Sequence, residues 1–137
     1  MKIEQATTVR KEWSSVCDSV VRERPYFIKR THDKIVLSSY ETMMQLLKDY
    51  QFTAKKVVES DGSVSLALAE MDIVVNGQTI EIARREMGAA ILEYAEEYYE
   101  NYYEYAHAPN RKDHLPYVMK ALLINEADAI GKELSCA

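Results

Sequence analysis

A helical stripe of apolar side chains runs through the second half of this 137-residue sequence. Its members recur every three or four residues: Ile80, Ala83, Met87, Ala90, Ile91, Tyr94 and Tyr98. This spacing is typical of an amphipathic α-helix, in which such positions share one face. We therefore expect a helix that begins at Thr79 and reaches about Tyr105, which would be the longest element of the chain.

The residues after this helix predict shorter elements. The sequence Ala108-Pro109-Asn110 breaks the helix, and another helix begins near Leu115-Pro116, because proline is tolerated in a first helical turn. The tail over residues 125–137 is weakly helical, and we expect it to fray.

Two segments with high β-strand propensity precede the long helix, over residues 53–58 and 64–75. The Asp61-Gly62 pair between them is a strong hairpin signal, and Asn76-Gly77 closes the second run. Residues 53–137 are thus predicted to form a β-hairpin followed by C-terminal helices.

The first part of the chain predicts a strand and a helix. A short polar-alternating segment over residues 2–6 leads to Thr7 and Thr8, which are good N-cap residues. An apolar helical face follows, made of Val9, Trp13, Val16, Cys17 and Val20. Arg24-Pro25 ends this helix, because a residue before proline disfavours the helical region.

A hairpin and a second helix complete the first fifty residues. Runs of β-branched and aromatic residues over 26–28 and 35–37 flank a polar turn. Ser38 and Glu41 form a capping box for a helix that runs to about Asp49. The fold class is therefore α+β, with a β-α-β-β-α module over residues 1–52 and a hairpin-plus-helices module over residues 53–137.

Composition excludes several classes of protein. The sequence has a net charge of −5, 47% hydrophobic residues and two cysteines. A chain of this length can bury a core, and its composition is not that of a disordered, collagen-like or disulfide-rich protein. It lacks a run long enough to span a membrane, a signal-peptide-like N-terminus and a CxxC pair. We expect a cytoplasmic protein with reduced cysteines.

The net charge conceals an asymmetry between the two halves. Residues 1–60 carry 11 basic and 8 acidic side chains, whereas residues 61–137 carry 6 basic and 14 acidic ones. The front half, residues 1–60, therefore has a net charge of +3, and the back half, residues 61–137, has a net charge of −8. This division favours a polyanion as partner of the front and a basic partner for the back. A chance fluctuation between two short segments is the alternative.

The nucleophilic and nucleotide-binding enzyme templates do not fit the residues. The sequence contains three histidines, and it lacks both a G-x-S-x-G motif and a Gly-rich phosphate loop. Glu104 and His107 have the E-x-x-H spacing of di-iron bundles, but that template needs a second such motif and two further glutamates. We expect these two residues to form a solvated helix end, and the protein to have no catalytic activity, no metal and no cofactor.

A run of glutamates and tyrosines ends the long helix. Four carboxylates lie along one stripe: Glu93, Glu97, Glu100 and Glu104. Their repulsion destabilises the helix slightly. One interpretation is a solvated face beside a tyrosine-rich core edge, and the other is a docking surface for a basic partner. The candidate partner-binding residues are Glu97, Tyr98, Glu100 and Tyr102.

Basic side chains gather at two places in the front half. Lys2, Arg10 and Lys11 flank the start of the first helix, whose N-terminal amides favour phosphate, and Thr7 or Thr8 adds a hydroxyl donor. Lys29 and Arg30 lie at the mouth of the hairpin. Such groups suit contacts with the phosphates of duplex DNA. A solvated surface with nearby acidic side chains is the alternative.

The order of residues in the front half resembles a known family. The motifs are Ala6-Thr-Thr-Val-Arg10 at the helix start, Ile28-Lys-Arg30 in the hairpin and Ile35-Val-Leu-Ser38 at its exit. Over about residues 2–50 the sequence is similar to the N-terminal domain of Phd/YefM antitoxins. The resemblance implies a type II toxin–antitoxin component. Such a protein dimerises, binds operator DNA to repress its own operon and neutralises a toxin through its C-terminal part.

The resemblance also implies roles for individual residues. Thr8 and Arg10 match the helix-start positions that contact DNA in the family, and Lys29 and Arg30 match its basic hairpin positions. Lys11 matches no family position, and we include it among the candidate DNA-binding residues because of its charge and its place beside Arg10. The implied partners are operator DNA and a basic toxin, by analogy a ribonuclease, and the chain would form a homodimer or a higher homo-oligomer with no membrane partner.

The back half departs from the family pattern. Many relatives end in a flexible acidic segment that folds on the toxin, whereas this chain continues with a hairpin and an amphipathic helix that should fold unaided. Two competing hypotheses stay open. One is a dimeric interaction protein that keeps the YefM-like fold without binding DNA, and the other is an unrecognised small enzyme.

Overall fold

The computed structural model describes residues 1–137 and divides into two compact units, Met1–Leu46 and Leu47–Ala137. Both helices and strands occur in each unit, so the predicted α+β class is confirmed. The division falls before the predicted boundary between residues 52 and 53, because Leu47 belongs to the second unit and Phe52 is buried in its core.

The first unit has the predicted β-α-β-β-α order, with its helix in two pieces. Its elements are β1 (Glu4–Gln5), α1 (Ala6–Lys11), α2 (Trp13–Arg22), β2 (Tyr26–Arg30), β3 (Asp33–Leu37) and α3 (Tyr40–Leu46). The sheet order is β1-β2-β3, with β1 parallel and β3 antiparallel to β2. The helix breaks at Glu12, whose backbone leaves the helical conformation.

The core of the first unit is very small. Its buried residues are Val9, Val16, Val20 and Ile28, which join α1 and α2 to the middle of β2. Large apolar side chains stay exposed on both faces of the sheet and on the helices: Ile3, Trp13, Val21, Phe27, Ile35, Val36, Tyr40 and Leu46. This unit therefore covers little of its own apolar surface.

The helix caps of the first unit differ from the predicted ones. Helix α1 begins at Ala6, so Thr7 and Thr8 lie inside its first turn instead of capping it. Ser39, not Ser38, caps α3, because the Oγ of Ser39 accepts a hydrogen bond from the backbone N–H of Thr42 at 3.1 Å.

The second unit contains a four-stranded sheet and four α-helices. Its elements are β4 (Thr53–Val58), β5 (Val64–Leu68), β6 (Val74–Gly77), α4 (Ile80–Glu100), α5 (Tyr102–His107), the 3-10 helix η1 (Lys112–His114), α6 (Leu115–Ile124), α7 (Ala127–Glu133) and β7 (Ser135–Cys136). The sheet order is β6-β5-β4-β7. The predicted second strand over 64–75 is in fact two antiparallel strands, since the chain turns between Leu68 and Val74.

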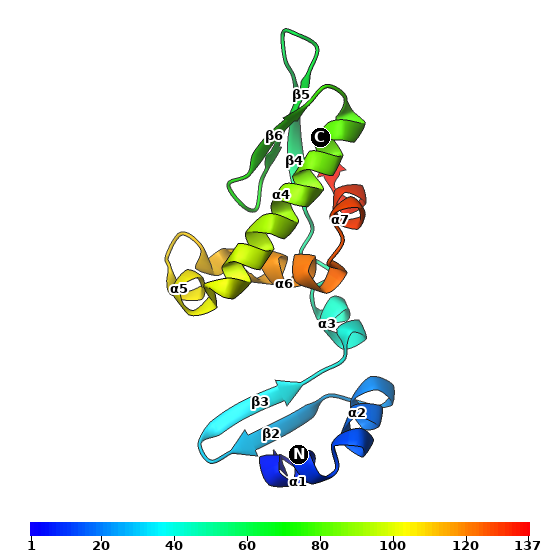
Figure 1. Cartoon of the computed structure of the whole chain (residues 1–137), viewed down its shortest axis with the longest axis vertical. Helices are drawn as coiled ribbons and strands as arrows, with labels where there is room; N and C mark the ends of the chain where they lie inside the picture. The colour runs from blue at the N-terminus through cyan, green and yellow to red at the C-terminus, as the bar shows by residue number, and fades with distance from the viewer. The chain divides into compact units, whose positions relative to one another are not determined.

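The long helix α4 covers one face of this sheet (Figure 1). The Oγ1 of Thr79 caps it by accepting a hydrogen bond from the N–H of Ile82 at 3.2 Å. The predicted apolar stripe is largely buried, with Ala83, Met87, Ile91 and Tyr98 all at 0% exposure. The helix ends at Glu100, and a kink at Asn101 separates it from α5. No helix of the chain combines the length and apolarity that crossing a membrane requires.

The C-terminal tail is ordered, so the prediction that it frays is wrong. Ile130 and Leu134 are buried in the core of the second unit. The backbone of β7 also pairs with β4, where the N–H of Ser135 donates to the carbonyl of Phe52 at 3.0 Å and the N–H of Ala137 donates to that of Ala54 at 3.1 Å. Burial and strand pairing together hold this segment in place.

Candidate functional site

The predicted DNA-binding residues of α1 are accessible. Thr8, Arg10 and Lys11 are all exposed. Arg10 also borders a shallow apolar hollow whose other walls include Trp13, Ile28 and Ile35. Because α1 has six residues, its dipole is shorter than that of the single long helix expected from the sequence.

The structure separates the two basic residues of the hairpin. Ile28 faces the helices, so alternation along β2 directs Arg30 to the helix side and Lys29 to the open face of the sheet. Arg30 forms an exposed ion pair with Asp33 at 2.8 Å. Lys29 lies opposite Lys34 of β3, and like charges in that relation destabilise a strand pair. Lys34 is a basic neighbour that the sequence reasoning missed.

The predicted partner-binding residues fall into two groups. Glu100 is exposed, and Tyr102 is 44% exposed with its ring edge-on to that of Tyr98 at 6.2 Å. Glu97 is exposed and accepts a hydrogen bond from the hydroxyl of Tyr105 at 3.0 Å. These three residues lie where a partner could reach them.

Tyr98 does not belong to this surface. Its side chain is fully buried, and its hydroxyl donates to the backbone carbonyl of Arg111 at 3.0 Å. Burial raises the pKa of this hydroxyl, so it stays protonated as a donor. The assignment of Tyr98 as a partner contact is therefore corrected: it is a core residue that fixes the loop after α5.

A polar cluster surrounds this loop. The guanidinium carbon of Arg111 lies 4.0 Å from the ring centre of Tyr105, and the hydroxyl of Tyr94 lies 2.7 Å from Nδ1 of His114. Burial raises the pKa of Tyr94 and lowers that of His114, so the hydrogen bond joins a protonated hydroxyl and a neutral imidazole. The cluster is structural, because these contacts join the loop to α4 and α5.

The E-x-x-H motif forms a local contact at the end of α5. Nδ1 of His107 lies 2.6 Å from the backbone oxygen of Tyr103, and the two rings lie 4.4 Å apart. No three His, Cys, Asp or Glu side chains of the chain gather in a way that could hold a metal ion.

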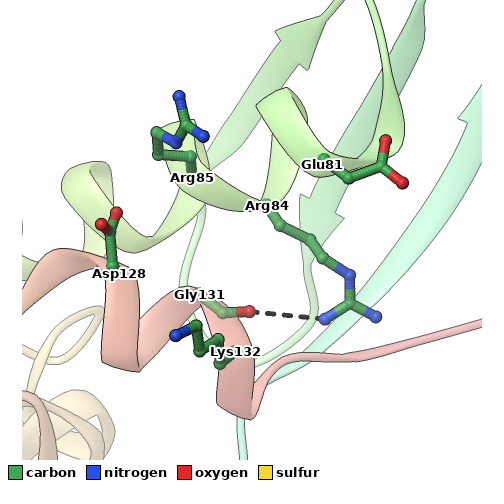
Figure 2. Close-up of a pocket in the computed structure, with 6 residues that line it drawn as sticks. All are labelled: Glu81, Arg84, Arg85, Asp128, Gly131 and Lys132. Carbon is green, nitrogen blue, oxygen red and sulfur yellow. Dashed lines mark hydrogen bonds between the residues drawn. The ribbon is translucent and has the colours of Figure 1, made fainter.

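A shallow pocket between α4 and α7 is lined by charged side chains (Figure 2). Arg84 extends to the last turn of α7, where it donates to the carbonyls of Gly131 at 3.4 Å and Leu134 at 2.9 Å. A cation in this position complements the orphan carbonyls of a helix C-terminus. Arg84 therefore serves to hold α7, and it explains part of the order of the C-terminal segment.

Comparison with known proteins gives the class of this protein, an antitoxin of a toxin–antitoxin system. Residues 1–135 match the model of the PHD-like family, described as "Antitoxin of toxin-antitoxin, RelE / RelB, TA system". The chain belongs to this family. Membership points to a regulatory protein, with a toxin as partner.

A solved structure is similar over the whole chain. It is the crystal structure of the antitoxin part of a proposed toxin/antitoxin system from Syntrophomonas wolfei subsp. wolfei. The two chains are 30% identical, the TM-score is 0.90, and the match covers 100% of this chain and 99% of that one. Comparison with curated protein sequences gives no match.

Proposed function

We propose that this antitoxin is of the Phd/YefM type, that it acts in the cytoplasm, and that it has two activities. As a homodimer or higher homo-oligomer it binds operator DNA through the first unit and represses its own operon. Through the acidic second unit it neutralises a basic toxin, by analogy a ribonuclease. The observation that carries the proposal is the family match over residues 1–135, which includes both units.

The small core of the first unit supports oligomerisation. A unit of 46 residues with four buried apolar side chains has little hydrophobic stabilisation of its own, and natural domains of this size are often completed by a second copy. Phe27 and Val36 are cross-strand neighbours on the open face of the sheet and are 41% and 58% exposed. A second chain that covers such side chains would supply the missing burial.

The placement of charge supports DNA binding by the first unit. It carries eight basic and six acidic side chains, a net charge of +2, whereas the second unit carries nine basic and sixteen acidic ones, a net charge of −7. Arg10 and Lys11 are exposed and form no ion pair, and Lys29 and Lys34 stand side by side without an acidic neighbour across the strands. Phosphates would relieve that repulsion.

Fluorescence anisotropy with duplex DNA from the region upstream of the chain's own gene tests this activity. The unaltered chain should bind with an affinity that falls steeply as salt rises. The double variant Arg10→Glu/Lys11→Glu should bind at least about tenfold more weakly. Arg85→Glu/Lys132→Glu, which changes charge equally in the second unit, is the control. Equal binding by both variants would contradict the proposal.

The toxin partnership is tested by co-expression with the protein encoded by the neighbouring gene. A stable complex that elutes as one species in size-exclusion chromatography is expected. Separate elution of the two proteins at micromolar concentration would remove the main support for neutralisation by this chain.

A second candidate function is a dimeric interaction protein that does not bind DNA. The ion pair between Arg30 and Asp33 favours it, because that pair withholds one of the predicted DNA contacts. The small charge of the first unit favours it too. The anisotropy experiment separates the two functions, since this alternative predicts no salt-dependent binding by the unaltered chain.

A further inference from the structure

Three exposed tyrosines lie where α4 passes into α5. Tyr99, Tyr102 and Tyr103 are 66%, 44% and 80% exposed, and we call them the tyrosine patch. Tyr99 lies in the last turn of α4, three and four residues before Tyr102 and Tyr103, which begin α5 after the kink at Asn101. Large side chains left uncovered together in this way are typical of interaction sites.

Two of the three rings of the tyrosine patch pack against neighbouring rings. Tyr102 packs edge-on against the buried ring of Tyr98 at 6.2 Å, and Tyr103 lies against the ring of His107 at 4.4 Å. Tyrosine gives a large contact area with little loss of side-chain entropy. Rings that are already fixed in the free chain reduce that loss further.

Acidic side chains without partners surround the tyrosine patch. Glu96 is three residues before Tyr99 on the same side of α4, and Glu100 follows one turn later. Both are exposed, and neither joins any of the three ion pairs of the chain. Negative charge at a helix C-terminus also opposes the helix dipole. These carboxylates therefore do not serve the stability of the free chain.

We propose that the tyrosine patch, together with Glu96 and Glu100, is the docking surface for an arginine- or lysine-bearing segment of the toxin. This inference rests on the proposed function. The carboxylates match a cationic partner in charge, and tyrosine rings accept the cationic heads and the aliphatic stems of such side chains. A nucleic acid is repelled by the same carboxylates.

The test uses the full chain and the protein encoded by the neighbouring gene, with affinity measured by calorimetry at two salt concentrations. Tyr99→Ser/Tyr103→Ser should weaken binding at least about thirtyfold, because exposed tyrosines in interfaces are frequent hot spots. Tyr99→Phe/Tyr103→Phe keeps the rings and should stay within about threefold of the unaltered chain.

Two double variants with the same change in net charge test whether the carboxylates of Glu96 and Glu100 contribute to binding. Glu96→Gln/Glu100→Gln should weaken binding about tenfold and reduce its salt dependence, whereas Glu59→Gln/Glu126→Gln, which removes two exposed carboxylates elsewhere in the second unit, should not. The first variant should also raise the melting temperature of the free chain, because fewer negative charges then lie at the C-terminal end of the α4 dipole. Weaker binding by a more stable protein excludes misfolding as the cause.

The outcomes separate this inference from the proposed function. If the unaltered chain binds and the serine and glutamine variants bind equally well, the docking surface is elsewhere and the inference is overturned alone. If the unaltered chain forms no complex with the neighbouring protein, the toxin partnership fails, and the inference fails with it.

Discussion

Tyr98 connects the parts of the second unit through its ring and its hydroxyl. The ring meets those of Tyr94, Tyr102 and Tyr105 edge-on at 6.1, 6.2 and 5.5 Å. The hydroxyl satisfies the carbonyl of Arg111. One fully buried side chain thus fixes α5 and the following loop relative to α4, and it supports the rings beside it.

Changes at Tyr98 should affect stability. Tyr98→Phe removes one buried hydrogen bond and should lower the free energy of unfolding by about 1 kcal/mol, and Tyr98→Ala should lower it by about 3–5 kcal/mol through loss of packing. Urea denaturation followed by circular dichroism measures both. Tyr103→Phe is the matched control on the surface, and a loss there equal to that of Tyr98→Phe would contradict the account.

His114 should make stability depend on pH. Burial is the main reason that its pKa lies below the ordinary value of 6.5. The positive charge of Arg111 lowers this pKa further, whereas the carboxylates of Asp72 and Asp113 oppose the shift. The unfolded chain therefore takes up a proton at a higher pH than the folded chain. The contribution of His114 to stability is complete above pH 6.5 and is lost as the pH falls from there through the folded pKa.

The variant His114→Asn keeps a hydrogen-bonding partner for the hydroxyl of Tyr94 and removes the titration. The loss in urea midpoint between pH 7 and pH 5 should be smaller in this variant than in the unaltered chain. Parallel losses in the two proteins would show that His114 does not titrate differently on folding.

At the scale of elements, α4 and α7 approach each other through two glycines. A Cβ added at Gly88 would lie 2.1 Å from the carbonyl oxygen of Ala127, and one added at Gly131 would lie 2.7 Å from that of Arg84. The helices can stay this close only where a side chain is absent. The contact anchors α7 and, through it, the strand β7.

Gly88→Ala should therefore destabilise the chain by about 1–3 kcal/mol, although alanine favours helices, because the helix backbones must separate. Ala89→Ser, one residue further on the exposed side of α4, should change stability by less than about 0.5 kcal/mol. Thermal unfolding compares the two. A Gly88→Ala protein as stable as the original would contradict the described crossing.

Periodicity predicted most of the elements but not their interruptions. Glu12 fits a continuing helix by residue type, so nothing local marked the break there. Asn101 is a residue type that favours helix ends, and this local signal was overlooked within the apolar spacing. The tail appeared weakly helical because its order depends on distant contacts with Arg84 and β4. The apolar spacing of α4 had already placed Tyr98 on the buried face, and that spacing could have removed it from the partner surface.

The choice of candidate surface residues depended on which side chains are exposed. A sequence gives the type of each residue, but it indicates the exposure of the side chain less well. Tyr99 and Tyr103 differ from the buried Tyr98 only in their position around the helix and beyond its kink. Lys34 became visible as a neighbour of Lys29 only through strand register. No sequence pattern marked Lys120, whose side chain is buried and whose Nζ donates to the carbonyl of Tyr50 at 2.8 Å.

At the scale of the whole molecule, charge divides between the two units. The first unit has a net charge of +2 and the second of −7. This asymmetry suits partners of opposite charge, DNA for one unit and a basic toxin for the other. The two proposed activities should therefore respond to different substitutions in the same chain.

Growth rescue tests most directly whether DNA binding and toxin neutralisation belong to different units of the chain. The protein encoded by the neighbouring gene is induced in cells that express either the unaltered chain or Arg10→Glu/Lys11→Glu, and colony formation is counted. Both chains should restore growth equally, although the variant should bind upstream DNA at least about tenfold more weakly. Failure of the unaltered chain to restore growth, or loss of rescue in the variant at equal protein level, would contradict the account.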